Sequence, residues 1–222
     1  MKQIYILLIA MYAIAFTACS KDDSSLEDGK EGIITLVHKT DYSDRDPVKM
    51  TFITFNKGKI ITIDWGDGNV EKIECHRARN SEGYYSNEIQ HKYTNSNPYI
   101  ITIKGRIRDF GCFSKHIISL DISKCPALTS LSCSPLALTS LDVSKNTALT
   151  SLNCADNNLT SLDVSGCPAL TRLQCNDNNL SASALNKIFN DLPPITYGEI
   201  SYWNNPGTDT CDKRILDYKG WY

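Results

Sequence analysis

The chain has 222 residues, of which 41% are hydrophobic and 22% are charged, a balance typical of a water-soluble globular protein with one or two domains. Its formal net charge is −2 and no block of lysines or arginines occurs, so nucleic acid is not among the expected partners.

The first eighteen residues have the pattern of an export signal. Lys2 supplies a positive start, and the apolar run "IYILLIAMYAIAF" is too short for a comfortable membrane span. Two small residues then precede Cys19 in "FTACSKDDSS". We expect residues 1–18 to be a signal peptide and residues 19–32 to be a flexible tether, because this polar stretch cannot bury enough apolar surface to fold. Ordinary secretory cleavage nearby is the alternative.

The same stretch resembles a bacterial lipobox, in which the cysteine becomes the lipidated first residue of the mature protein. The following "SKDDSS" resembles the acidic export tag of surface lipoproteins in Bacteroidetes-type bacteria. This resemblance implies lipidation at Cys19 and a location in the outer membrane, with the protein exposed on the cell surface.

Residues 33–105 contain short runs rich in Ile, Val, Thr and aromatic residues, often alternating with polar ones. The runs are "IITLVH", "VKMTFITF", "GKIITIDW", "NVEKIEC" and "YIITIKG". Such runs predict strands of a half-buried antiparallel sheet. The segment "DWGDGNV" predicts a hairpin turn at Asp67-Gly68, since glycine accepts a positive φ.

Two motifs in this region, "IDWGDGNVEKIE" and "IQHKYTNSNPYIITIKG", resemble those of the polycystic-kidney-disease-type (PKD) β-sandwich. The resemblance implies a spacer, or a module that binds carbohydrate or protein. The insertion at residues 75–88 departs from the family pattern. Core packing and turn hydrogen bonds are the expected roles of Trp65, His91 and Tyr93. The residues that carry the resemblance are Asp64, Trp65, Gly66, Asp67, Gly68, His91 and Tyr93.

Residues 106–222 contain two interleaved series that repeat every 21 residues. Segments of the form "SLDVS" begin at residues 119, 140 and 161, and segments of the form "LTSLNC" begin at residues 128, 149 and 170. This period indicates a solenoid, and the L-x-x-L-x-C-x-x-N spacing resembles that of leucine-rich repeats. Each series is expected to form one strand per coil, so that three coils stack.

The cysteine of this unit recurs as Cys133, Cys154 and Cys175, at an apolar position that points into the coil. A thiol there acts as a small apolar filler. Zinc is not expected, because no cysteine pair has ligand spacing, and a ladder of three cannot pair completely in disulfides. Three more cysteines fall outside the repeat, and the sequence leaves their pairing open: Cys75, Cys112 and Cys211.

A helix is expected to close the solenoid at its C-terminal end. The segment "SASALNKIFNDLPP" places four apolar residues on one helical face and ends at two prolines. The predicted fold class is therefore mainly β, with an N-terminal PKD/Ig-like β-sandwich at residues 33–105. A short C-terminal leucine-rich-repeat solenoid with a helical C-terminal cap follows at residues 106–222. The apolar helix residues are Leu185, Ile188, Phe189 and Leu192.

Outward positions of the "LTSLNC" strands differ between coils, whereas the leucines do not. An exposed strand face is the usual binding surface of a solenoid. Alternation along a strand puts Asn153, Arg172, Gln174 and Asn176 outside, and we predict these four as ligand-binding residues. They form a polar patch with one cation, suited to a polar or acidic partner. A solvated face that binds nothing produces the same pattern.

Three aspartates, Asp121, Asp142 and Asp163, recur at one place in the other series. They are expected to accept hydrogen bonds from serine, threonine and turn amides rather than to hold Ca²⁺, which needs converging oxygen ligands. No G-x-S-x-G, H-E-x-x-H or phosphate-binding glycine loop is present. The sequence therefore predicts no enzyme, cofactor or metal.

Two functions remain open. The first is a non-catalytic binding or adhesion module whose repeat face contacts a protein or glycan ligand at the cell surface. The second is a glycan-binding accessory lipoprotein of a nutrient-uptake system, which would use exposed aromatic residues. The aromatic candidates are Trp65, Tyr84, Tyr85 and Trp203.

Overall fold

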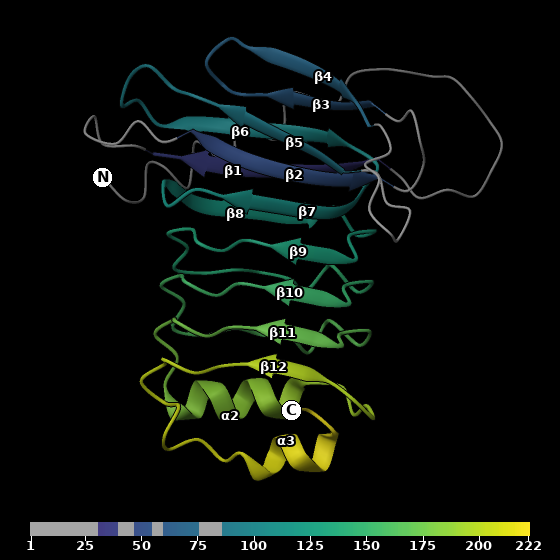
Figure 1. The fold of residues 1–222 in the computed structure, drawn as a ribbon, viewed down its shortest axis with the longest axis vertical. Coiled ribbons are helices and arrows are strands. Elements are labelled where there is room, and N and C mark those ends of the chain that lie inside the picture. Colours follow the sequence, from purple (N-terminus) through teal and green to yellow (C-terminus); the bar gives the residue numbers. More distant parts are fainter. Residues whose placement is uncertain (1–30, 40–46, 55–59, 76–85) are drawn as a thin grey trace, which may run out of the picture.

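The computed structural model describes residues 31–39, 47–54, 60–75 and 86–222. These residues form an elongated stack of β-strands that lie across the long axis, with two helices at the C-terminal end (Figure 1). The mainly β class is therefore confirmed. Cys19 and the signal segment lie outside the described residues, and so do Tyr84 and Tyr85. In the part of the chain that is described, no helix has the length and apolar character needed to cross a bilayer.

The first sheet has five strands in the order β4-β3-β6-β1-β8, and all its neighbours are antiparallel. Alternate residues of β1, such as Ile34 and Leu36, are fully buried, as expected for strands with one face on a core. The strands are β1 (Gly32–His38), β3 (Ile60–Asp64), β4 (Val70–Glu74), β6 (Tyr99–Gly105) and β8 (Ile117–Lys124).

The second sheet has seven strands in the order β12-β11-β10-β9-β7-β2-β5. It is antiparallel from β5 to β7 and parallel from β7 to β12. The strands are β2 (Val48–Thr54), β5 (Ser86–His91), β7 (Ile107–Phe113), β9 (Ser130–Ser132), β10 (Ser151–Asn153), β11 (Arg172–Gln174) and β12 (Glu199–Ser201).

Strand β7 joins the two halves of the molecule. Phe110 lies opposite Phe52 of β2 on one side and opposite Leu131 of β9 on the other. The domain boundary between residues 105 and 106 stays a prediction. Strand β7, which follows this boundary, pairs with β2, which precedes it. One buried apolar cluster accordingly runs from the antiparallel half through the coils to the helices.

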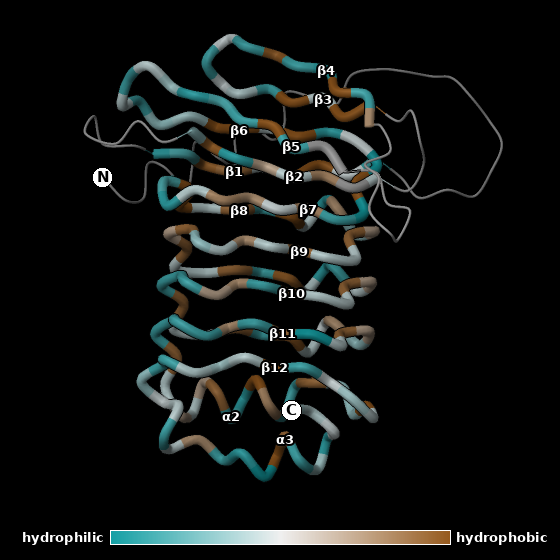
Figure 2. Tube along the Cα trace, in the orientation of Figure 1, coloured by the Kyte–Doolittle hydropathy of each residue, from teal (hydrophilic) through white to brown (hydrophobic). Residues whose placement is uncertain are grey.

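The solenoid has five parallel strands, whereas the 21-residue repeat by itself accounts for three. At both ends the repeat continues without its consensus leucine: Phe110 takes that place in β7, and Ile200 takes it in β12. Figure 2 shows apolar and polar positions alternating along the stacked coils. The first and last coils therefore use different apolar side chains for the same inward position.

A ladder of buried asparagines connects each coil to the coil before it. Asn178 donates from Nδ2 to the carbonyl oxygens of Cys154, Cys175 and Asn176, at 2.9, 3.3 and 3.1 Å, and its Oδ1 accepts the backbone N–H of Leu159. Asn157 and Asn205 make the same set of contacts in the neighbouring coils. These amides satisfy backbone groups that the turns would otherwise leave unpaired.

The second repeat series does not form a strand in every coil, so that prediction was wrong. Only its first copy is a strand, β8, which has β1 as a pairing partner. Residues 140–144 and 161–165 are irregular. In these two copies Asp142 and Asp163 accept the backbone N–H two residues ahead, each at 2.9 Å, as Asp121 does within β8, so the copies differ in strand pairing and not in this local bond.

Two helices cover the last coil. Helix α2 (Ala182–Asp191) begins at Ser181, whose side chain accepts the N–H of Ala184, and it buries Leu185, Ile188 and Phe189 as predicted. Helix α3 (Arg214–Lys219) ends at Gly220, which adopts φ = 78°. The chain then returns to β12, where Gly198 pairs with the buried Trp221.

Candidate binding surface

The cysteine ladder lies inside the coils and offers no reactive group. Cys133, Cys154 and Cys175 are free, fully buried thiols, as predicted. The Sγ atoms of Cys133 and Cys154 donate to the carbonyl oxygens of Asn153 and Gln174 in the next coil, both at 3.4 Å. Burial raises the pKa of Cys154 to about 12, so this thiol does not ionise at neutral pH.

The ladder has a fourth member that the sequence placed outside the repeat. Phe110 pairs with Leu131 and Gly111 with Ser132, which puts Cys112 beside Cys133. Cys112 is a free, buried thiol whose pKa is raised by burial. Cys211 is also a free thiol, and Cys75 is buried.

The aspartates of the second series are used within their own turns. Asp121, Asp142 and Asp163 each accept the N–H of the serine two residues ahead at 2.9 Å. Hydrogen bonds from Ser165, together with Lys187 at 3.2 Å, lower the pKa of Asp163 to about 2. Among the described residues, no three histidine, cysteine, aspartate or glutamate side chains are grouped to hold a metal ion.

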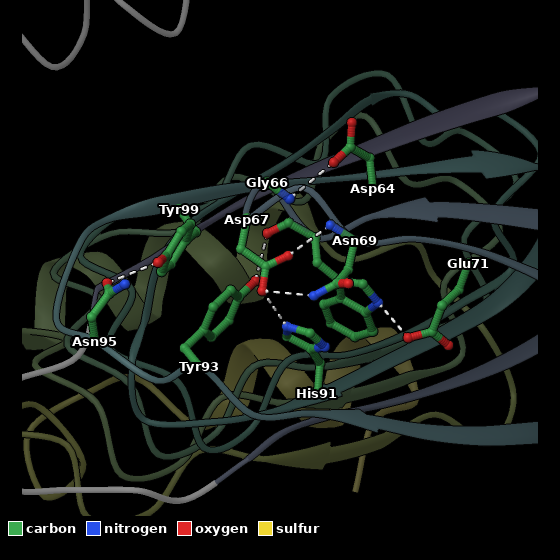
Figure 3. Close-up of polar contacts among 10 residues, drawn as sticks. Asp64, Gly66, Asp67, Asn69, Glu71, His91, Tyr93, Asn95 and Tyr99 are labelled. Carbon is green, nitrogen blue, oxygen red and sulfur yellow. Dashed lines mark hydrogen bonds and ion pairs between the residues drawn. The ribbon is translucent and has the colours of Figure 1, made fainter.

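The W-G-D-G turn between β3 and β4 packs against the H-x-Y segment after β5 (Figure 3). His91 Nε2 lies 2.8 Å from Asp67 Oδ2, and the Tyr93 hydroxyl donates to the carbonyl oxygen of Trp65 at 2.7 Å. Gly66 has φ = 78°, and a Cβ there would lie 2.5 Å from the carbonyl oxygen of Ile100. Only glycine fits this position, and the two motifs hold the hairpin in place.

Trp65 cannot serve as a glycan platform, which corrects its place among the aromatic candidates. Its side chain is fully buried, stacks on His91 with the ring centres 4.4 Å apart, and donates from Nε1 to Glu71 at 2.8 Å. A buried indole with a hydrogen-bond partner is a core residue. The expected core role of Trp65, His91 and Tyr93 is therefore confirmed.

The solvent side of the parallel strands forms one continuous polar surface. Its side chains alternate with the buried Leu131, Leu152, Leu173 and Ile200. We call this surface the outer face. It consists of Ser130, Ser132, Ser151, Asn153, Arg172, Gln174, Glu199 and Ser201.

The structure brings three of the four predicted ligand residues together on this outer face. Asn153 lies opposite Gln174, and Arg172 lies opposite Glu199 of β12. Arg172 and Glu199 form an exposed ion pair at 2.7 Å. The single cation expected from the sequence is thus paired with a carboxylate, which removes the reason to expect an acidic partner.

The fourth predicted residue, Asn176, lies where β11 ends, beside the last coil. Continuing the register of Gln174 with Ser201 by two residues places Asn176 next to Trp203. The N–H of Asp177 donates to the carbonyl oxygen of Trp203 at 3.0 Å, which confirms this neighbourhood. Asn176, predicted as a ligand residue of the repeat face, therefore lies next to Trp203, an aromatic candidate for glycan binding.

No family model and no curated protein matches the sequence. Among solved structures, the chain is similar to the functional domain of InlJ from Listeria monocytogenes, which is described as including a cysteine ladder. The identity is 34% and the TM-score is 0.39, over 51% of this chain and 24% of that chain. The match thus spans about a quarter of that chain's length. The leucine-rich-repeat-like solenoid is established by the strand pairing and ladders of the present structure.

Proposed function

We propose that this chain is a lipid-anchored surface protein that binds a protein or glycan ligand through the outer face and catalyses no reaction. The observation that carries this proposal is the outer face itself, which is polar and continuous from β9 to β12. Its side chains vary while the buried leucines repeat, and exposed strand faces are the usual binding surfaces of solenoids. The ligand-binding residues are Asn153, Arg172 and Gln174, with Asn176 at the edge.

In this proposal the antiparallel half is a PKD-like spacer that sets the orientation of the coils. Its shared strand β7 is hydrogen-bonded to β2 and to β9. A spacer connected through one sheet holds its partner at a fixed angle, unlike a flexible linker. The tether at residues 19–32 then supplies the freedom of movement between the membrane and the folded part.

The anchor is tested by replacing Cys19 with alanine and fractionating the cells. We expect the variant to leave the outer-membrane fraction and to lack the added mass of the acyl chains. Replacing Lys21, Asp22 and Asp23 together with alanine should lower the accessibility of the protein to surface protease while membrane attachment persists. An unchanged mass and location of the Cys19→Ala protein would contradict the anchor.

The binding surface is tested by screening the purified protein on a glycan array and on a protein array in parallel. The triple variant Asn153→Ala, Arg172→Ala and Gln174→Ala should lose the ligand that the arrays identify. Asn153 also accepts the backbone N–H of Ala155 at 3.1 Å, so its replacement should cost about 1 kcal/mol, and the other two substitutions no more than about 0.5 kcal/mol each. The variant should therefore stay folded with a slightly lower melting temperature. A second triple variant provides the control on the other side of the coils: Thr139→Ala, Ser140→Ala and Thr160→Ala. Binding that both triple variants retain would contradict the outer face as the site.

A further inference from the structure

Trp203, directly after β12, is an exposed aromatic residue that the repeat does not require. Its side chain is 51% exposed, whereas Trp65 and Trp221, the two other tryptophans of the chain, are 0% and 1% exposed. The same position in the preceding coils holds Ser134, Ala155 and Asn176, so small and polar residues serve the coil equally well. Packing within the solenoid therefore does not explain an indole at this place.

A connected set of polar side chains comes from residues next to Trp203: Asn204, which follows it in the chain, and Asn176 and Asp177 in the neighbouring coil, where the N–H of Asp177 donates to the carbonyl oxygen of Trp203. The carboxylate of Asp177 accepts Nδ2 of Asn176 at 2.6 Å and Nδ2 of Asn204 at 2.8 Å. Asp177 and Asn204 have φ values of 54° and 55°, which these residue types tolerate and which end the two strands. Because the amides are held by the carboxylate, their remaining donors and acceptors are oriented before any ligand arrives.

The charges near Trp203 favour a neutral, hydroxyl-rich ligand. Arg172 is paired with Glu199 at 2.7 Å, and the charged residue whose backbone is hydrogen-bonded to Trp203 is Asp177. A carboxylate accepts hydrogen bonds from hydroxyl groups and repels phosphate, sulfate and uronate groups. A pyranose ring combines an apolar C–H face, which stacks on an aromatic ring, with hydroxyl groups at its rim.

A second exposed ring flanks the same end of the outer face. Tyr222 is 71% exposed, and its backbone pairs with β12, since its N–H donates to Gly198 and its carbonyl oxygen accepts from Ile200. Its position is therefore fixed beside Glu199, one step beyond the last strand. The last coil therefore carries one exposed ring at each end of β12, and the polar set lies on the β11 side of Trp203.

We propose that Trp203, Asn176, Asp177 and Asn204 form a subsite for one pyranose ring of a neutral glycan. The sugar stacks its C–H face on the indole and shares its hydroxyl groups with the amides and the carboxylate. The proposal rests on the proposed function, because it names the ligand class for one end of the outer face. It extends that face beyond the predicted residues to the last coil.

The test uses neutral hexasaccharides of glucose, mannose and xylose as probes, with heparin as the acidic control. Affinity is measured by titration calorimetry, and binding is followed in parallel by tryptophan fluorescence. Because the other two tryptophans are buried, a change in quenching by acrylamide reports on Trp203. We expect at least one hexasaccharide to bind and to protect Trp203 from quenching, and heparin not to bind.

Matched variants test whether Trp203 binds the sugar by ring stacking or whether the loss of any exposed aromatic residue has the same effect. Trp203→Ala should weaken binding of that hexasaccharide by about two- to tenfold, which is the scale of one lost aromatic contact, and Trp203→Phe should restore part of it. Tyr218→Ala removes an aromatic residue of α3 that is 90% exposed, and it should leave the affinity unchanged. Equal affinities for the protein and its Trp203→Ala variant would overturn the proposal.

The same experiments distinguish an error in the subsite proposal from an error in the proposal that the outer face binds a ligand. If no hexasaccharide binds but a protein ligand binds and is lost in the Asn153, Arg172 and Gln174 triple variant, the carbohydrate subsite is wrong and the outer face stands. If neither oligosaccharides nor arrayed proteins bind, both proposals are wrong. Preferential binding of heparin over the neutral probes would also overturn the subsite, because it would reverse the expected charge preference.

Discussion

The antiparallel half and the coiled half of this molecule bury apolar sheet faces in different ways. In the antiparallel half, large residues such as Phe52 and Trp65 each occur once and make contacts that nothing repeats. In the coils, the same position is filled in turn by Cys112, Cys133, Cys154 and Cys175, and asparagine contacts recur with them. The first arrangement concentrates stability in single side chains, whereas the second distributes it over ladders. Substitutions should therefore have larger single effects in the first half.

Replacing Trp65 with alanine should have the largest effect. The side chain is fully buried, and removing such an indole costs about 3–5 kcal/mol of unfolding free energy. Trp203→Ala is the matched control, because its exposed side chain predicts a loss of no more than about 0.5 kcal/mol. Denaturant unfolding of both variants measures the difference. Similar losses for the two tryptophans would contradict the assignment of Trp65 to the core.

Replacing one asparagine of the ladder should cause the second-largest loss of unfolding free energy. Asn178→Ala removes one acceptor and three donor contacts and leaves buried backbone groups unsatisfied, so a loss of about 2–4 kcal/mol is expected. The neighbouring Asn179 is exposed, and Asn179→Ala should change stability by no more than about 0.5 kcal/mol. Hydrogen exchange should show faster opening of the coils on both sides of Asn178. Exchange that changes only in one coil would mean that the ladder does not couple them.

The antiparallel half should also respond to acid. His38 is buried against Tyr93, with ring centres 4.4 Å apart, and faces His116 at 5.9 Å. Burial lowers the pKa of His38 to about 4, and repulsion from His116 and His91 adds to the effect. The unfolded chain therefore binds a proton between about pH 6.5 and 4 that the folded chain does not, so stability falls as the pH drops through this window.

The expected loss between pH 7 and pH 5 is about 2 kcal/mol for this histidine. His38→Phe keeps an aromatic ring beside Tyr93 but cannot titrate. Unfolding free energies at the two pH values should therefore differ less in the variant than in the unmodified protein. An identical difference in both proteins would exclude His38 as the source.

The cysteine ladder should give the smallest of these effects. Cys154→Ala leaves a small cavity and loses one weak hydrogen bond, so a destabilisation of about 1–2 kcal/mol is expected. Cys154→Val should be tolerated better, since Val143 and Val164 already fill the facing side of the coils. A thiol reagent should label Cys133, Cys154 and Cys175 only after unfolding. Rapid labelling of the native protein would show that the ladder is accessible.

Sequence periodicity predicted the interior of the coils because each buried position repeats. Cys154, its neighbours in the ladder and the apolar face of α2 could all be read from spacing alone. The first coil was missed because Phe110 replaces the consensus leucine, and with it the membership of Cys112 in the ladder. Spacing of 21 residues between Cys112 and Cys133 was the available signal.

The candidate surface was predictable only in part. Asn153, Arg172 and Gln174 follow from alternation along a strand, but their partners in β12 do not. Arg172 and Glu199 are 27 residues apart, because α2 lengthens the last coil beyond the repeat. The ion pair and the position of Trp203 beside Asn176 depend on this longer connection. The core role of Trp65 was expected from its motif, but its stacking on His91, which lies 26 residues further along the chain, is seen only in the fold.

The orientation of the strands has a mechanical consequence. Because they lie across the long axis, a pull along that axis opens the ladders one strand at a time instead of shearing whole strands past each other (Figure 1). Each 21-residue coil that opens releases about 70 Å of extended chain. Tension would therefore lengthen the molecule in equal steps from the 21-residue coils and in a longer step from the last coil, which spans 27 residues.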